Sequence, residues 1–298
     1  MQTVAFDSHG TRCEGWYLEA LNDDLTTSRG RPCLVMAHGF GATRDAGLLP
    51  FAERFCAAGI DVLVFDYRGF GTSDGEPRQD VDHRRHREDY HAALAWVRAR
   101  KGVDAARVGV WGSSYSGGHV VAVAAADQRV AAVVSQGAAM DGLAALRGTQ
   151  QSDGAGKAAR NTAAAVRDAA GALLGRPPVL LPIVGPPGSG AVISAEGAVE
   201  GYEAISGPTF RNEMLARGLL RVPRNRPVRQ AGKVTCPMLV VVAEEDNIAP
   251  VSAVHEAARR APRAEVLSFA CGHFDIYVGE VFEKSSAEQV EFLRRVLA

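Results

Sequence analysis

Ser114 stands at the end of the apolar run Val108-Gly109-Val110-Trp111, where the chain changes abruptly to small residues. Gly112 lies two residues before it and Ser116 two residues after it, so the pattern is G-x-S-x-S. Small residues at these two positions let a strand turn sharply into a helix and expose the side chain at the apex. The pattern therefore predicts a nucleophile elbow, although such a turn also occurs as a plain packing solution.

A serine hydroxyl is a poor nucleophile at neutral pH, so it needs a base and a carboxylate that orients the base. His273 follows an apolar stretch that ends at Phe269, and Asp246 follows the apolar stretch 238–243. Both residues therefore lie just beyond predicted strands, at the edge where parallel α/β sheets bind their ligands. Together with Ser114 they predict acyl transfer through a covalent acyl-enzyme.

The sequence leaves alternatives for each of these residues. His273 could be a surface histidine, and Asp246 could cap the segment that follows it. Three other carboxylates could then supply the acid: Glu244, Glu245 and Asp141. His38 is better explained as a scaffold residue of its loop than as a base.

The elements that must position these residues alternate between strands and helices up to about residue 140. Strands are predicted at 3–6, 13–18, 32–37, 61–65, 107–111 and 130–135, and helices at 48–58, 80–100 and about 115–126. Continuous apolar strands separated by helices predict a mostly parallel sheet of about eight strands that helices cover on both faces. The first two strands surround a Ser-His-Gly turn and predict a hairpin at the sheet edge.

The alternation stops between about residues 141 and 233. It resumes with strands at 238–243 and 264–269 and with helices at 251–260 and 285–297. A structureless loop of this length is improbable in a compact domain, so we predict a core domain of residues 1–140 and 234–298 with a mostly helical cap of residues 141–233. Helices are predicted within the cap at 196–205 and 211–220. Seven apolar cap residues could roof a substrate pocket or only bury the cap against the sheet: Leu173, Leu174, Val179, Leu180, Leu181, Ile183 and Val184.

Three further patterns are better explained without a ligand. His83, His86 and His91 fit a solvated helix face better than a metal site. The glycine-rich run 185–190 lacks the Lys and the Ser or Thr of a phosphate loop. The arginine-rich stretch 217–229 could contact an anionic substrate, but a solvated linker explains it better. No metal ion or cofactor is predicted.

The composition limits the class of protein. The chain has 298 residues, of which 47% are hydrophobic, so it can bury a full core, and its net charge of −1 favours neither nucleic acid nor an anionic membrane. Five cysteines without C-x-x-C spacing disfavour disulfides and a zinc cluster, and predict buried free thiols. The N-terminus shows no basic segment followed by an apolar one, so a cytoplasmic setting is expected.

The motifs together resemble the α/β-hydrolase superfamily over nearly the whole chain. Besides the elbow and the acid and histidine turns, His38-Gly39-Phe40-Gly41 resembles the family's oxyanion loop, and the segment 66–75, Asp-Tyr-Arg-Gly-Phe-Gly-Thr-Ser-Asp-Gly, resembles its turn after a strand. The hairpin, the tyrosine after the serine and the long cap are similar to the dienelactone-hydrolase-like and X-Pro-dipeptidyl-peptidase-like branches. A weaker likeness is to acyl hydrolases and transferases of polyketide pathways. The departure is Ser116, which stands where the family has a second glycine.

The resemblance implies a role for each site residue. Ser114 would attack the carbonyl carbon, His273 would accept and return the proton, and Asp246 would orient the imidazole. The backbone N–H groups of Phe40 and Tyr115 would form the oxyanion hole.

We expect a serine esterase that acts on a small acyl substrate, apolar in part, with a thioester or a lactone as related substrates. The alternatives are an acyltransferase or thioesterase acting on polyketide-type chains, a peptidase of X-Pro type, and a non-catalytic binding module. The additional C-terminal β-domain of the peptidases has no counterpart in this sequence. A homo-oligomer is compatible with the sequence, which does not specify one.

Overall fold

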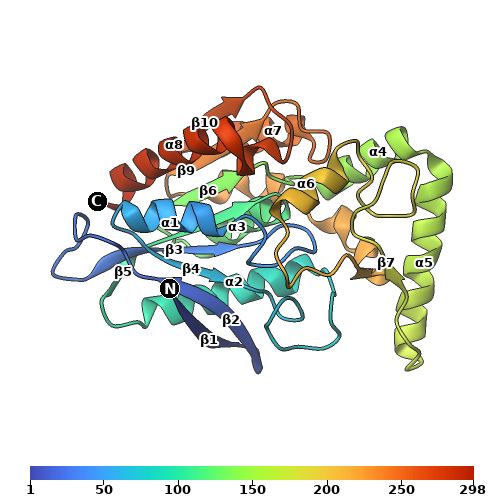
Figure 1. The fold of residues 1–298 in the computed structure, drawn as a ribbon, viewed down its shortest axis with the longest axis horizontal. Helices are drawn as coiled ribbons and strands as arrows, with labels where there is room; N and C mark the ends of the chain where they lie inside the picture. Colours follow the sequence, from blue (N-terminus) through green and yellow to red (C-terminus); the bar gives the residue numbers. More distant parts are fainter.

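The computed structural model describes the backbone of residues 1–298 and the side chains of residues 1–148 and 154–298. Eight strands form one sheet in the order β1-β2-β4-β3-β5-β6-β9-β10 (Figure 1). The β1–β2 and β2–β4 pairs are antiparallel, and every other neighbouring pair is parallel. The predicted mostly parallel sheet with an edge hairpin is therefore confirmed.

The apolar runs of the sequence account for the strands of this sheet, because strands buried on both faces have few polar side chains. β3, β4 and β9 are almost entirely buried along their length. The strands of the main sheet are β1 (Gln2–Ser8), β2 (Thr11–Leu18), β3 (Arg31–Ala37), β4 (Asp61–Phe65), β5 (Val103–Ser113), β6 (Val133–Gln136), β9 (Met238–Ala243) and β10 (Ala264–Phe269).

Helices cover both faces of the sheet. On one face, alternate strand residues such as Val35 and Val110 pack against α2 (His83–Arg98), α3 (Tyr115–Ala126) and α7 (Val251–Arg260). On the other face, residues such as Met36 and Trp111 pack against α1 (Leu49–Ala57) and α8 (Gly279–Leu297). The central strands thus contribute to two cores, and the loops at the carboxyl ends of β3, β5, β9 and β10 carry the candidate residues.

The chain between β6 and β9 forms the remaining elements. They are α4 (Gly142–Asp153), α5 (Ala155–Leu173), α6 (Ala198–Ile205), the short strands β7 (Leu180–Leu181) and β8 (Met214–Leu215), and short 3₁₀ helices at Ala216–Leu220, Val222–Arg224, Pro227–Arg229 and Ala231–Lys233. A further 3₁₀ helix, Asp275–Tyr277, follows β10.

The prediction of a helix over 211–220 is wrong for its first half, because Met214–Leu215 is a strand and only Ala216–Leu220 is helical, as a 3₁₀ helix. Met214 and Leu215 pair with β7, and the N–H groups of Leu215 and Ala216 donate to the carbonyls of Gln79 and Val179. These backbone groups are used in contacts with distant parts of the chain, and such contacts override local helix propensity.

Part of the predicted apolar roof is also wrong. Leu173 and Leu174 are 88% and 67% exposed, because α5 lies at the outer edge of the molecule, away from the main sheet (Figure 1). Leu180 is exposed too, whereas Ile183 and Val184 are buried in the core that contains α2 and α3.

Candidate active site

Ser114 occupies the tight turn between β5 and α3 with φ +58° and ψ −122°, a conformation that non-glycine residues rarely adopt. A Cβ on Gly112 would overlap the backbone carbonyl of Ser116, so the close approach requires glycine there. The Ser114 N–H donates to the Gln136 carbonyl at 2.9 Å, and the Ser114 carbonyl accepts from Ala139 at 2.9 Å. The start of the next loop therefore holds the strained turn in place.

The two neighbouring serines have other partners. The Ser116 hydroxyl hydrogen-bonds the Tyr90 hydroxyl at 2.7 Å, and the Ser113 hydroxyl hydrogen-bonds the Tyr277 hydroxyl at 2.5 Å. Both serines are buried, whereas Ser114 is partly exposed. Of the three, Ser114 is the one that a substrate can reach.

Ser114, His273 and Asp246 form a continuous hydrogen-bonded chain, although they are far apart in the sequence. His273 Nε2 lies 3.1 Å from Ser114 Oγ, and His273 Nδ1 lies 2.6 Å from Asp246 Oδ2. The side chains of His273 and Asp246 are 5% and 3% exposed. Such an arrangement can remove the serine proton and stabilise the imidazolium that forms.

The two oxygens of the Asp246 carboxylate have different partners. Oδ2 contacts the imidazole, while Oδ1 accepts from the backbone N–H groups of Ile248 at 2.8 Å and Ala249 at 2.7 Å. Asp246 therefore contacts His273 and also closes its own turn. The two roles that the sequence offered for it, orienting the imidazole and capping the following segment, are compatible.

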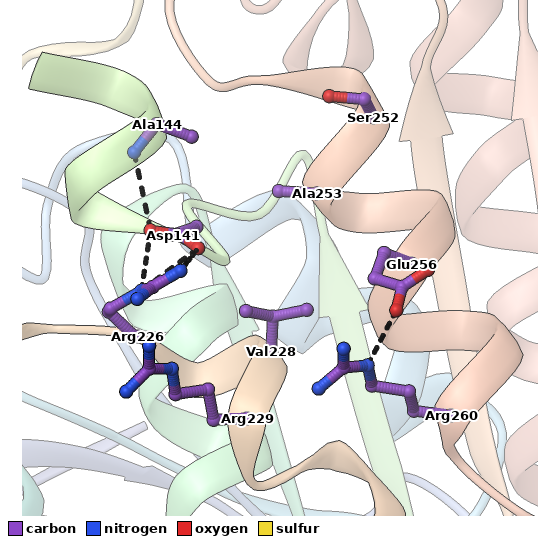
Figure 2. Close-up of a pocket in the computed structure, with 9 residues that line it drawn as sticks. All are labelled: Asp141, Ala144, Arg226, Val228, Arg229, Ser252, Ala253, Glu256 and Arg260. Carbon is purple, nitrogen blue, oxygen red and sulfur yellow. Dashed lines mark hydrogen bonds and ion pairs between the residues drawn. The ribbon is translucent and has the colours of Figure 1, made fainter. Parts of the chain in front are cut away.

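Two of the three alternative acids are engaged elsewhere, and the third, Glu245, is exposed. Glu244 contacts His255 and Ser268 on the surface. Asp141 caps the start of α4 and forms an ion pair with Arg226 at 2.7 Å beside α7, as Figure 2 shows. The hollow drawn there measures about 400 Å³ and contains none of the three residues of the Ser114 chain.

The loop after β3 brings Phe40 to the serine. A Cβ on Gly39 would lie 3.0 Å from Ser114 Cβ, and the Phe40 ring meets the Tyr115 ring edge-on at 5.2 Å between centroids. The Phe40 N–H has no acceptor among the residues that the structure describes. The Tyr115 N–H belongs to the first residue of α3, where no intrahelical acceptor is available. Both groups can therefore donate to a ligand.

The segment 66–75 supports this loop from behind. Asp66 accepts from the Arg44 N–H at 2.7 Å and pairs with the Arg44 guanidinium at 3.0 Å, with both side chains buried. Burial raises the pKa of Asp66 to about 6 despite this neighbouring cation. His38 is buried as well, and burial lowers the pKa of its imidazole to about 4.

The prediction of a solvated histidine face on α2 is wrong for His83 and His86, whereas His91 is half-buried. His83 and His86 are buried, and the His86 ring stacks on Tyr67 with 4.0 Å between centroids. His86 Nδ1 also lies 3.3 Å from Nε2 of His119, a residue of α3. The cause is that the start of α2 packs against α3 and the segment 66–75 instead of facing water. Among the described residues, no group of three or more His, Cys, Asp or Glu side chains could hold a metal ion.

The arginine-rich stretch is also less solvated than predicted. Arg221 pairs with Asp80 at 2.6 Å, and Arg226 pairs with Asp141. The first of these half-buried ion pairs joins the returning chain to the core, and the second joins it to the start of α4. All five cysteines are free thiols; four are buried, as predicted, whereas Cys236 is half-buried.

Tyr202 and Phe274 lie near the site although neither gave a signal in the sequence, whereas Ile183 is one of the predicted apolar cap residues. The Tyr202 hydroxyl donates to the Phe40 carbonyl at 2.9 Å, and Ile183 occupies the space where a side chain on Gly41 would lie. The Phe274 ring meets both the His273 ring and the Tyr202 ring edge-on. Only tertiary packing brings these residues together, since no motif connects them.

Comparison with known proteins identifies the family. A family model described as "alpha/beta hydrolase fold" matches residues 32–280. The chain belongs to the alpha/beta hydrolase family. The fold and the resemblance expected from the sequence are thereby confirmed for this hydrolase.

The relatives of this alpha/beta hydrolase carry names that indicate several different activities. The quorum-quenching protein AidA of Acinetobacter baumannii is 39% identical over 296 residues, which cover 99% of this chain and 94% of AidA. The thiohydrolase aneE of Aspergillus aculeatus is 29% identical, covering 94% of this chain and 93% of aneE. The crystal structure of the alpha/beta hydrolase GrgF from a Penicillium species matches with a TM-score of 0.81 at 27% identity, covering 99% of this chain and 98% of GrgF.

None of the helices that the structure describes is both long and apolar enough to cross a membrane.

Proposed function

We propose that this hydrolase cleaves carboxylic ester or thioester bonds through a covalent acyl-enzyme on Ser114. The observation that carries the proposal is the hydrogen-bonded chain from Ser114 Oγ through His273 to Asp246. His273 accepts the serine proton as Oγ adds to the carbonyl carbon, and then protonates the leaving alcohol or thiol. Water activated by the same imidazole releases the acid and restores the serine.

The N–H groups of Phe40 and Tyr115 are proposed to stabilise the oxyanion. Their support is the position of the loop at 39–41 against Ser114 and the start of α3 directly after the serine. Each such donor is worth about 3 kcal/mol to the transition state.

The substrate is proposed to be a small acyl compound with an apolar part. Aromatic and aliphatic side chains lie in the oxyanion loop or near it: Phe40, Tyr115, Ile183, Tyr202 and Phe274. Residues 141–233 supply Ile183 and Tyr202, so we propose that this segment is a cap and helps select the acyl group. The thiohydrolase aneE supports thioesters as one substrate class.

A fluorophosphonate probe tests the proposal directly, because it forms a covalent bond only with an activated serine. We expect stoichiometric labelling of Ser114, no labelling of S114A, and hydrolysis by the wild type of at least one substrate in a panel of p-nitrophenyl esters, an acyl thioester and a lactone. A folded wild-type protein that is neither labelled nor active would overturn the proposal.

Acyl transfer is a second candidate, and the polyketide transferase grgF, 29% identical over 299 residues, is the observation that favours it. The same acyl-enzyme would then react with an alcohol or amine in place of water. Product analysis with competing acceptors separates the two functions. A transferase yields mostly acylated acceptor at acceptor concentrations far below that of water, whereas a hydrolase yields free acid.

A further inference from the structure

We infer that Tyr202 is a positioning residue of the oxyanion loop, so that the segment between β6 and β9 takes part in the chemistry as well as covering it. The inference rests on the proposed function of Ser114. It depends on one buried hydrogen bond and on how the surrounding residues restrain the two groups that form it.

The bond joins α6 to the loop after β3. The Tyr202 hydroxyl donates to the Phe40 carbonyl at 2.9 Å, and both residues are buried. Because Phe40 lies between Gly39 and Gly41, and Gly41 has φ +63°, the backbone here has more conformational freedom than other residues would allow. The donor from Tyr202 therefore fixes the peptide group that joins Phe40 to Gly41. Through the shared Phe40 Cα it also limits how far the preceding peptide group, which carries the Phe40 N–H, can move.

The Tyr202 ring is itself held on two sides. It stacks on Phe210 at 5.6 Å and meets Phe274 edge-on at 5.4 Å between centroids. Phe274 follows His273 directly, and their rings lie 5.0 Å apart. The tyrosine therefore contacts both the oxyanion loop and the residue next to the histidine.

A second anchor lies further along the same loop. Asp45 accepts from the backbone N–H of Thr209 at 3.0 Å and from its hydroxyl at 2.9 Å. With Ile183 packed on Gly41, the loop is held at three places by residues from the segment between β6 and β9. Tyr202 makes the contact nearest the proposed oxyanion donor.

Loss of the Tyr202 hydroxyl is expected to weaken the stabilisation of the transition state specifically. When Ser114 Oγ adds to a carbonyl carbon, its proton passes to His273 and the carbonyl oxygen becomes an oxyanion that needs the Phe40 N–H. Without the Tyr202 hydroxyl, the peptide group between Phe40 and Gly41 rotates more freely, and the Phe40 Cα and the N–H attached to its nitrogen shift relative to the oxyanion. Substrate binding in the ground state is little affected.

The test is Y202F, which removes the hydroxyl and keeps the ring that packs on Phe210 and Phe274. We expect kcat to fall about tenfold to a hundredfold while KM changes less than threefold, since complete loss of one oxyanion donor costs about 10²–10³ in kcat. A trifluoromethyl ketone, which forms a tetrahedral oxyanion adduct with the serine, should bind more weakly by a similar factor. The control is Y17F, because the Tyr17 hydroxyl bonds Asp61 at 2.5 Å, at the opposite end of β4 from the site.

Amide hydrogen exchange provides a readout that does not depend on activity. In Y202F we expect faster exchange at residues 39–42 than in the wild type and in Y17F. Unchanged exchange there, or a kcat within twofold of the wild type in an active enzyme, would overturn the inference. Absence of labelling in the wild type would contradict the proposed function instead, and the exchange experiment would still decide the contact.

Discussion

The two oxygens of the Asp246 carboxylate have different functions. Substitutions that remove one function or both should therefore differ in their effects on activity and stability. Oδ2 holds the His273 imidazole and Oδ1 accepts two backbone N–H groups of its own turn. An asparagine keeps an oxygen for the turn but loses the negative charge that selects the imidazole tautomer. An alanine loses both functions.

We therefore predict that D246N lowers kcat about ten-thousandfold with stability within about 1 kcal/mol of the wild type. D246A should lose a similar amount of activity and in addition about 3 kcal/mol of unfolding free energy, because two N–H groups lose a charged acceptor. Ester hydrolysis and urea unfolding measure the two effects. Equal stability of D246N and D246A would contradict the division of tasks.

The Arg44–Asp66 pair is a second feature at the residue scale. Both side chains are buried, and the pair lies directly behind the oxyanion loop. We predict that R44M lowers the unfolding free energy by about 3–5 kcal/mol at pH 7.5, since Asp66 stays buried without its cation. The exposed pair Arg54–Glu283 offers the control, and R54M should cost less than about 1 kcal/mol.

At the scale of elements, α6 approaches the loop after β10 closely enough to exclude a side chain. A Cβ on Gly201 would overlap the Phe274 ring, and Phe274 packs against His273. The orientation of the histidine is therefore coupled to the position of α6.

We predict that G201A destabilises the fold by about 1–3 kcal/mol and lowers kcat, because the inserted methyl group forces the Phe274 ring to move. Gly156 in α5 is the matched control: a Cβ there meets only an Arg160 nitrogen at 3.6 Å. G156A should stabilise the helix by up to about 1 kcal/mol. Thermal unfolding of both variants tests this, and equal melting temperatures would refute the close packing of α6.

At the scale of the whole molecule, buried imidazoles should dominate the stability in mild acid. Burial lowers the pKa of His38 and His83 to about 4 and the pKa of His86 and His119 well below its ordinary value. These groups take up protons on unfolding once the pH falls below about 6.5, so they lower the stability as the pH decreases.

We predict a marked loss of unfolding free energy between pH 7 and pH 5, with about 2 kcal/mol at pH 5 from each fully buried imidazole. Burial raises the pKa of Asp66 and Asp89, which oppose this trend because the fold binds their protons more tightly than the unfolded chain does. Urea unfolding across this pH range measures the slope, and H86F should reduce it by about one proton. A stability that does not change between pH 7 and 5 would contradict the prediction.

The sequence alone determined the strand and helix order of the core, the elbow at Ser114 and the candidates His273 and Asp246. The reason is that these features depend on local chemistry: apolar runs specify buried strands, and small residues specify the tight turn. Polar residues just past parallel strands meet at one sheet edge whatever loops join them. Local motifs are therefore sufficient to indicate which three side chains meet at the site.

Tertiary structure decided what surrounds that site. Within the segment 211–220, Leu215 and Ala216 donate their backbone N–H groups to distant carbonyls, which interrupts the predicted helix. His83 and His86 at the start of α2 are buried because α3 and the segment 66–75 cover them. The contact of Tyr202 with Phe40 joins residues 162 positions apart. Packing between such distant segments depends on the shape of the whole molecule, which no local pattern in the sequence encodes.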